Sequence, residues 1–356
     1  MAAQRDSLHA AVARVVDSGW FVLGPETEAF EREFAEYVGV SECVGVGNGT
    51  DALELALIAI GVTAGDMVVT VANAGMYTTA AALKVGARPL FVDVDPDDLL
   101  VDVTALGATL DRNGSEIRAV VVTHLYGQLV DLAPVVGLCA PLGIPVVEDC
   151  AQAIGARRDG RSAGASGTVS AFSFYPTKNL GALGDGGAVV TDDLAVAARV
   201  RQLRQYGWDR KYHSVVSGGR NSRLDEIQAA VLRLRLPATV AGNAIRRSIL
   251  ARYRDALPAG PRRMVLAALD DSHSGHLAVL RTPTREADRA HLAAAGVTTD
   301  IHYPVPDHHQ PVLAGRSTVS LPVTEAAAGE VLTLPCFPQL TDNEVVRVCA
   351  SLRALA

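Results

Sequence analysis

Cysteine and long apolar runs are scarce in this 356-residue chain, and each scarcity excludes a class of protein. The five cysteines are odd in number and widely spaced, with no C-x-x-C pair, a pattern typical of free thiols in a reducing compartment. No apolar run approaches the length of a transmembrane helix, and the N-terminus lacks a charged leader followed by an apolar core. We therefore expect a cytoplasmic protein with no membrane partner.

Clustered positive charge is missing as well. The chain has 32 Lys and Arg against 39 Asp and Glu, a formal net charge of -7, and no run of basic residues forms a stripe. Nucleic acid is therefore excluded as an expected partner. Apolar residues make up 49% of the chain, which is enough for the core of one large domain and a smaller companion.

Short apolar segments alternate with helical segments in the first half of the chain. We expect strands at 67–71, 89–94, 119–123 and 144–147, and helices at 78–85 and 132–142. This alternation predicts an α/β fold with a mostly parallel central sheet flanked by helices. A composition shift near 236–243 predicts a division into a large domain, 1–240, and a smaller C-terminal α+β domain, 241–356.

The segment VSAFSFYPTKNLGALGDGGAVVT, residues 169–191, places Lys178 between an apolar strand and a block of glycines. The strand is expected to deliver Ser173 and Tyr175 to a site, and the glycines allow close backbone approach before a second strand. Apolar surroundings disfavour the ammonium form of a lysine, so its free amine becomes a nucleophile toward carbonyl compounds. Lys178 is our candidate for the covalent anchor of an aldehyde cofactor.

The segment GNGTDALELALIAIG, residues 47–61, predicts a turn that leads into a helix. A helix N-terminus presents unpaired amides and the positive end of its dipole, so a phosphate group would sit well over Gly49 and Thr50. The same residues are also consistent with a simple helix cap.

The segment VVEDCAQAIGA places Glu148 and Asp149 at the carboxyl end of an expected strand, where open α/β sheets bind their ligands. A role in capping the next turn fits Glu148 better than Asp149. His124, in the turn HLYGQLVDL, is interpreted as a structural histidine. His302, His308 and His309 lack a Cys or carboxylate at ligand spacing, so no metal site is predicted.

Taken in order, these motifs resemble the DegT/DnrJ/EryC1/StrS family of sugar aminotransferases, which are pyridoxal-phosphate enzymes of fold type I. The resemblance implies that Lys178 binds pyridoxal 5′-phosphate covalently and moves a proton during transamination. It implies that Asp149 keeps the pyridine nitrogen protonated. It also implies a homodimer with two shared active sites.

The same resemblance assigns roles to further residues. Gln152 and Ser173 would contact the cofactor together with Gly49 and Thr50, and Asn221 would reach the cofactor phosphate of the partner subunit. The residues expected at the sugar are Tyr175, Tyr212, His302, Tyr303 and His308. Relatives place an aromatic residue near Gly75 that stacks on the cofactor ring. This chain offers Met76 and Tyr77 there, and we take Tyr77.

The function implied is transfer of an amino group from L-glutamate to a nucleotide-linked 3-keto-6-deoxy sugar, with dTDP as the nucleotide and antibiotic or deoxysugar biosynthesis as the setting. Gln152 in place of His, Tyr175 three residues before the lysine, Asn73, and the HYPVPDH loop favour amination at C3. L-Glutamine as donor, a 4-keto sugar or a cyclitol as acceptor, a sugar 3-dehydratase and a non-enzymatic regulator stay open as alternatives. Lys178 argues against the dehydratase, because those relatives carry His there.

Overall fold

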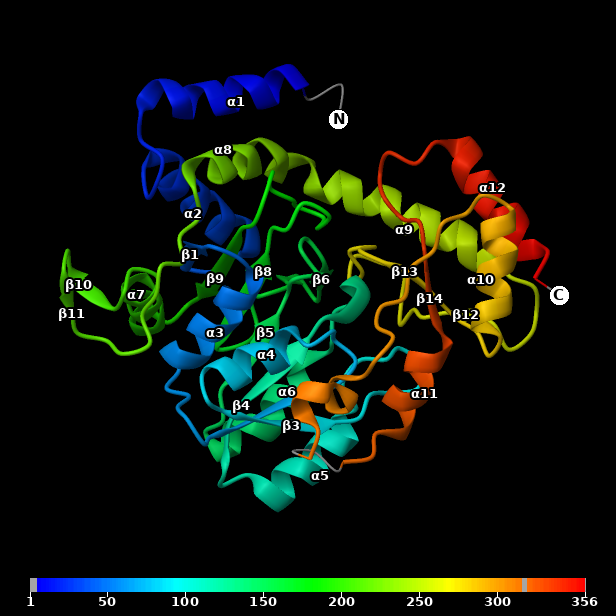
Figure 1. Ribbon diagram of the computed structural model, residues 1–356, viewed down its shortest axis with the longest axis horizontal. Coiled ribbons are helices and arrows are strands. Elements are labelled where there is room, and N and C mark those ends of the chain that lie inside the picture. Colours follow the sequence, from blue (N-terminus) through cyan, green and yellow to red (C-terminus); the bar gives the residue numbers. More distant parts are fainter. Residues whose placement is uncertain (1–4, 316–318, 356) are drawn as a thin grey trace.

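The computed structural model describes residues 5–315 and 319–355. Its centre is a seven-stranded sheet with the strand order β1-β9-β8-β5-β4-β2-β3 (Figure 1). The strands are β1 (Glu42–Val46), β2 (Met67–Val71), β3 (Arg88–Val92), β4 (Ile117–Thr123), β5 (Val146–Asp149), β8 (Val169–Ser173) and β9 (Gly187–Thr191). The strand pairs from β3 through β8 are parallel. Strand β9 runs in the opposite direction to the other six, so its pairs with β8 and β1 are antiparallel. The predicted mostly parallel sheet is confirmed.

Helices cover both faces of this sheet, because its central strands carry apolar side chains on both sides. One face packs on α3 (Gly49–Ala59), α4 (Tyr77–Lys84) and α7 (Leu194–Leu203). The other face packs on α2 (Pro25–Val38), α5 (Val103–Asn113), α6 (Leu132–Cys139) and α8 (Glu226–Arg235). The predicted α/β architecture is therefore confirmed.

The expected segments agree with the observed ones to within a few residues, and β2 matches its prediction at both ends. The helix expected at 132–142 ends as an α-helix at Cys139 and continues as a 3-10 turn through Leu142. Helix α5 was not predicted. It follows Asp102, whose side chain accepts hydrogen bonds from the amides of Thr104 and Ala105 and so caps the helix.

The C-terminal part is built around the long helix α9 (Thr239–Ala256) and a small antiparallel sheet. That sheet consists of β12 (Arg263–Met264), β13 (Ala278–Arg281) and β14 (Val331–Leu334), with helices α10 (Arg285–Ala294), α11 (Pro322–Glu330) and α12 (Asp342–Arg353) nearby. Ile249, Leu250 and Tyr253 of α9 lie in its core. The predicted division at 240/241 falls in the first turn of α9 and stays a prediction.

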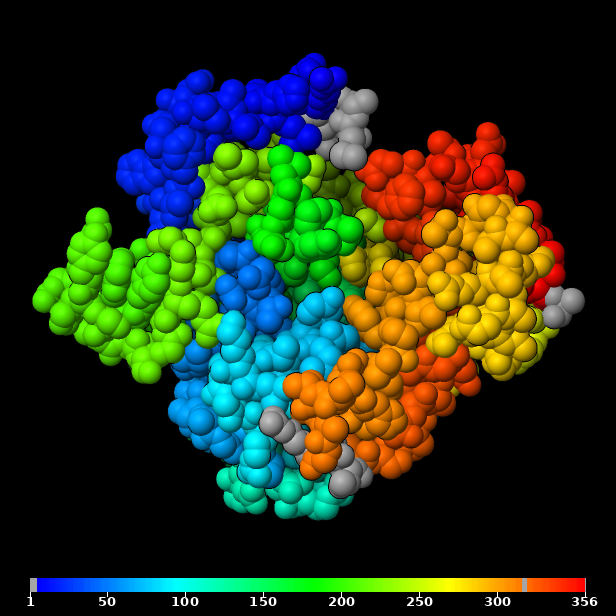
Figure 2. Space-filling view, in the orientation of Figure 1, coloured from blue at the N-terminus to red at the C-terminus, as the bar shows by residue number. Residues whose placement is uncertain are grey.

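Two peripheral features complete the described chain. Helix α1 (Arg5–Ser18) lies across α8, and a two-stranded ribbon of β10 (Trp208–Arg210) and β11 (His213–Ser214) projects from the body (Figures 1 and 2). Two further short strands are β6 (Arg157–Arg158) and β7 (Arg161–Ser162). Among residues 5–315 and 319–355, none of the helices has the length and apolar character needed to span a bilayer.

Candidate active site

A cavity of about 1360 Å³ opens where the carboxyl ends of β5 and β8 meet the start of α3. Lys178, Asp149 and Gln152 line it from the large sheet, and His276, His302 and Tyr303 line it from the C-terminal part. Because parallel strands end at the same edge of a sheet, residues far apart in sequence converge here. The structure thus brings the predicted lysine and aspartate into one cavity.

Lys178 stands in a tight turn after β8. Its amide donates to the carbonyl of Tyr175, at 2.8 Å, and the amide of Ala182 donates to the carbonyl of Phe174, at 2.8 Å. A Cβ at Gly181 would lie 2.5 Å from the carbonyl oxygen of Pro176, so this turn requires glycine there. Burial lowers the pKa of Lys178, although the charge of Asp149 opposes the shift. The turn therefore presents an amine that is easier to deprotonate than an exposed lysine.

Asp149 ends β5 with its side chain buried. Its Oδ1 accepts a hydrogen bond from the amide of Ala151, at 3.1 Å. Burial raises the pKa of this carboxyl group, and the amide of Ala151 and the charge of Lys178 partly offset that effect. A buried carboxylate of this kind is stabilised by a cationic N–H group placed against it. This buried acceptor fits a protonated pyridine nitrogen as its donor.

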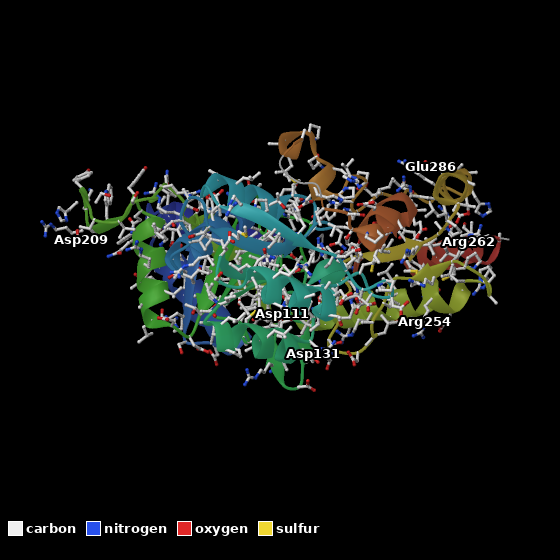
Figure 3. The ribbon with its side chains drawn as sticks, turned by 90° about the horizontal axis from the view of Figure 1, so that it is seen from below. Asp111, Asp131, Asp209, Arg254, Arg262 and Glu286 are labelled. Atoms are coloured by element: carbon white, nitrogen blue, oxygen red, sulfur yellow. The ribbon has the colours of Figure 1, made fainter. Side chains whose placement is uncertain are left out.

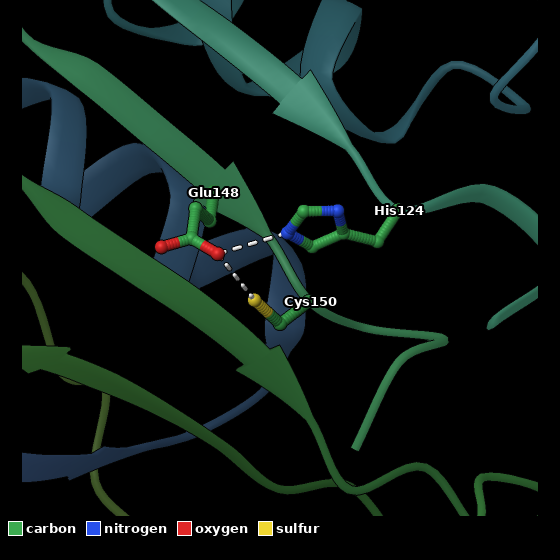
Figure 4. Close-up of side chains that lie close together, drawn as sticks. All are labelled: His124, Glu148 and Cys150. Atoms are coloured by element: carbon green, nitrogen blue, oxygen red, sulfur yellow. Dashed lines mark hydrogen bonds and ion pairs between the residues drawn. The ribbon is translucent and has the colours of Figure 1, made fainter. Parts of the chain in front are cut away.

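Glu148, the neighbour of Asp149, points to the other side of the strand and has a different role. Its carboxylate accepts from the amides of Gly164, Ser166 and Gly167 and contacts Nε2 of His124 at 2.9 Å (Figure 4). Burial would raise its pKa, but the hydrogen bonds from His124 and from the amides of Gly164 and Gly167 hold the pKa below its usual value. The structural role predicted for His124 is confirmed. The turn directly after β5 was expected to be capped by Glu148, but Asp149 accepts from the amide of Ala151 there, and Glu148 holds the turn at 164–167 instead.

The start of α3 forms a cradle beside the lysine turn. Asn48 caps the helix by accepting from the amide of Asp51, and Asn48, Gly49 and Thr50 line the cavity. A Cβ at Gly49 would lie 2.6 Å from Cβ of Ser173, so a larger residue would close the space against β8. The first amides of a helix have no intrahelical acceptor, and a phosphate group satisfies them. The cradle therefore fits a phosphate.

Gln152 connects the two sides of the cavity. Its Oε1 accepts from the amide of Tyr126, at 2.6 Å, and its Nε2 donates to the hydroxyl of Tyr303, at 3.1 Å. The ring of Tyr303 lies against Gly75, where a Cβ would be 2.7 Å from a ring carbon. The space beside Gly75 is thus taken by a tyrosine from the C-terminal part. Tyr77 lines the cavity with its ring edge-on to Tyr303.

Sequence reasoning missed a polar group directly after the lysine. Asn179 contacts Nδ1 of His276 at 2.8 Å through Oδ1, and its Nδ2 donates to Asn243 Oδ1 at 2.7 Å. His276 is buried, and burial together with the charge of Lys178 places its pKa well below its usual value. The adjacency of Asn179 to Lys178 was the only sequence signal, since His276 and Asn243 stand in no motif.

The remaining predicted residues divide into two groups. Tyr175 and His302 line the cavity, whereas His308 is buried outside its lining, beside Phe91 and Glu325. Tyr212 is 79% exposed next to the β10–β11 ribbon, and Asn221 is exposed and paired with Gln205. Neither Tyr212 nor Asn221 lines the cavity of its own chain.

The chain is similar to known proteins over nearly its whole length. The model of the DegT/DnrJ/EryC1/StrS aminotransferase family matches residues 3–353. A dTDP-3-amino-3,4,6-trideoxy-α-D-glucose transaminase of Micromonospora megalomicea subsp. nigra is 43% identical over 98% of this chain and 95% of its own length. The crystal structure of S. venezuelae DesV in complex with a ketimine intermediate superposes with a TM-score of 0.94, at 42% identity over 98% of this chain and 94% of DesV. NtdA from Bacillus subtilis, solved with bound cofactor PMP, superposes with a TM-score of 0.92, at 28% identity over 99% of this chain and 82% of NtdA.

Proposed function

Because the chain belongs to the DegT/DnrJ/EryC1/StrS aminotransferase family, we propose that it transfers an amino group from L-glutamate to C3 of a dTDP-linked 3-keto-6-deoxy sugar, with pyridoxal 5′-phosphate as cofactor. The observation that carries the proposal is the meeting of Lys178 and the buried Asp149 in one cavity beside a phosphate cradle. The sugar and nucleotide rest on similarity to the trideoxyglucose transaminase.

The residues present fit this cofactor. Gly49, Thr50 and Ser173 would hold its phosphate, Asp149 would face its ring nitrogen, and Lys178 would form the covalent bond. When bound, pyridoxal phosphate supplies an aldehyde for attachment and a ring that accepts electrons. The carboxylate of Asp149 stabilises positive charge at the ring nitrogen.

Lys178 would have a second role once the amino donor has displaced it from the cofactor. Its Nζ takes up the proton lost by the α-carbon of the donor, and in the second half-reaction it supplies a proton to C3 of the sugar. The lowered pKa of Lys178 favours the neutral amine that accepts the first proton. Tyr303 and Gln152 close one side of the cavity and limit the access of water to these steps.

The sugar would lie between Tyr175, His302 and Tyr303. His302 is fixed from two directions, because its carbonyl accepts from the hydroxyl of Tyr126, at 2.6 Å, and its Nδ1 contacts Thr333 Oγ1 at 2.9 Å. Shifting a ketone by one ring carbon changes which hydroxyl groups find partners, and a buried unpaired polar group costs about 1–3 kcal/mol. A fixed wall of this kind therefore selects one regioisomer.

The active unit is proposed to be a homodimer in which Asn221 and Tyr212 complete the partner's site. Three aromatic residues support this, because the exposed Tyr206 and Tyr212 form one cluster of rings with the half-buried Trp208 on the projecting ribbon. Mixing inactive Lys178→Ala chains with inactive Asn221→Ala chains under subunit exchange should restore part of the activity, because one composite site is then intact. Full activity of a monomer would contradict this assembly.

The test of the reaction is identification of the product by NMR. The purified chain with cofactor and L-glutamate would receive 3-keto and 4-keto nucleotide sugars in parallel. A 3-amino sugar is expected. A 4-amino sugar would overturn the regiochemistry and leave the aminotransferase assignment, whereas no amino sugar from either substrate would overturn the proposed substrate class. L-Glutamine in place of L-glutamate tests the donor in the same assay.

A further inference from the structure

Two histidines and a carboxylate lie close together outside the cavity, in segments that follow His302 and Tyr303 in the chain. His308 and His309 belong to a 3-10 turn, Asp307–His309, and Glu325 belongs to α11. Oε1 of Glu325 lies 3.2 Å from Nε2 of His308 and 3.9 Å from Nε2 of His309. One ligand atom from each of the three residues lies within 4.8 Å of the others. The prediction of no metal site at His308 and His309 considered only nearby residues and missed Glu325, which stands 16 residues beyond His309.

Among the described residues there is a second cluster of metal-ligand residue types, whose ligand atoms are already engaged in hydrogen bonds. His124, Glu148 and Cys150 are buried together (Figure 4). Nδ1 of His124 accepts from the amide of Val130, so its proton is on Nε2, facing Glu148. Burial raises the pKa of the Cys150 thiol well above its usual value, so the thiolate that a metal needs is disfavoured. The side chains of this cluster are therefore engaged in hydrogen bonds that stabilise the fold.

The cluster of His308, His309 and Glu325 contains no thiol and is only partly buried, because His308 is buried whereas His309 and Glu325 are not. The side chains of His309 and Glu325 are 53% and 33% exposed, so an ion and a water molecule can reach them. Within the described residues, the hydrogen bonds and ion pairs to Glu325 fall on Oε1, where the amide of Leu321 also donates, at 2.9 Å. Oε1 is therefore the oxygen that faces both imidazoles, and the distances to a shared ion are judged from it.

We propose that His308, His309 and Glu325 bind one divalent transition-metal ion of the zinc class, with water in the fourth position. Bonds of about 2.0–2.2 Å place the ligand atoms of a tetrahedral site roughly 3.3 Å apart, so the observed 3.2 and 3.9 Å require small side-chain movements. Two imidazoles with one carboxylate suit zinc, cobalt or nickel, whereas magnesium and calcium prefer oxygen ligands throughout.

The ion would join the turn Asp307–His309, which contacts the start of α4 beside the cavity, to α11. Asp307, next to His308, accepts from the amide of Met76 at 2.9 Å and from the hydroxyl of Thr79 at 2.5 Å, at the start of α4. A metal ion bound by this turn and α11 would therefore stabilise the segment that carries His302 and Tyr303, on the side that faces away from the cavity. An ion that binds only the folded chain also raises its melting temperature as the ion concentration rises.

The experiment uses the full chain with its cofactor and without a histidine tag, freed of metal by a chelator. Zinc is added in equilibrium dialysis, and cobalt(II) is added separately to record the visible spectrum of a tetrahedral site. His309→Gln and Glu325→Gln are the test variants. The matched control is His213→Gln, since His213 forms an exposed pair at 2.6 Å with Asp209, which Figure 3 labels, and belongs to no group of three metal-ligand side chains among the described residues.

We expect one zinc ion per chain and an intense tetrahedral cobalt spectrum for the wild type and for His213→Gln. Both test variants should bind zinc at least tenfold more weakly and lose that spectrum. Their circular dichroism should match the wild type, because His309 and Glu325 lie partly at the surface. Failure of the wild type to bind one ion per chain, or unchanged binding by both test variants, would overturn the proposal.

Discussion

The two sides of the active-site cavity are built in different ways. The cofactor side consists of residues at the ends of neighbouring strands, so Asp149, Ser173 and Lys178 are placed by the sheet itself. The C-terminal side is placed by single side-chain bonds that span long stretches of sequence, such as Tyr126 to His302 and Gln152 to Tyr303. We infer that substitutions on the first side change the chemistry, whereas those on the second change substrate binding.

Lys178→Ala gives the largest expected effect, which is complete loss of turnover. The chain has three lysines, Lys84, Lys178 and Lys211, so borohydride reduction followed by peptide mapping identifies the one that carries the cofactor. The label is expected on Lys178 alone. Label on either of the other two would show that the cofactor side has been misassigned.

Asp149 and Glu148 form a natural pair for separating chemistry from stability. Asp149→Asn should lower kcat strongly while the cofactor still binds, since each pKa unit lost at the ring nitrogen corresponds to about 1.4 kcal/mol. Glu148→Gln should lower the free energy of unfolding, because this carboxylate holds the amides of the 164–167 turn and His124. Steady-state kinetics and denaturant unfolding measure the two effects. Near-normal turnover of Asp149→Asn would show that Asp149 is structural.

Asp307→Ala tests the C-terminal side. Both Asp307 and Asp102 accept hydrogen bonds at a helix start, so either substitution by Ala should cost about 1 kcal/mol of stability. Only Asp307 fastens the segment that carries His302 and Tyr303. We therefore expect KM for the keto sugar to rise about tenfold in Asp307→Ala and to stay unchanged in Asp102→Ala. Equal kinetics for the two variants would remove the distinction between the two sides.

The smallest expected effect concerns pH. Burial and the charge of Arg247 lower the pKa of His273 to about 4. The unfolded chain therefore binds a proton below pH 6.5 that the folded chain refuses, so stability is complete above that pH and falls as the pH drops toward 4. Between pH 7 and 5.5 the loss is roughly 1 kcal/mol. His273→Gln should flatten this dependence in denaturant unfolding, and an unchanged slope would contradict the assignment.

The division between the two sides also marks what the sequence could predict. Strand spacing and glycines near Lys178 are local signals, and they predicted the lysine turn, Asp149 and the cradle at Gly49 correctly as neighbours. The packing of Tyr303 against Gly75 and the bond of Asn179 to His276 depend on side chains about 100 or more residues apart, which no periodicity encodes. His308 was expected at the sugar because its loop resembles a segment that lines the sugar site in the family, whereas the structure places it outside the cavity lining.

Helix α9 links the two parts of the chain mechanically. Its first turns supply Thr239, Asn243 and Arg246 to the cavity wall, and its later turns supply Ile249, Leu250 and Tyr253 to the C-terminal core. A continuous helix transmits rotation along its axis as a rigid rod. Any tilt of the C-terminal part therefore moves the cavity wall with it, so opening and closing of the site would have to come from the loops around the cavity and not from a hinge within α9.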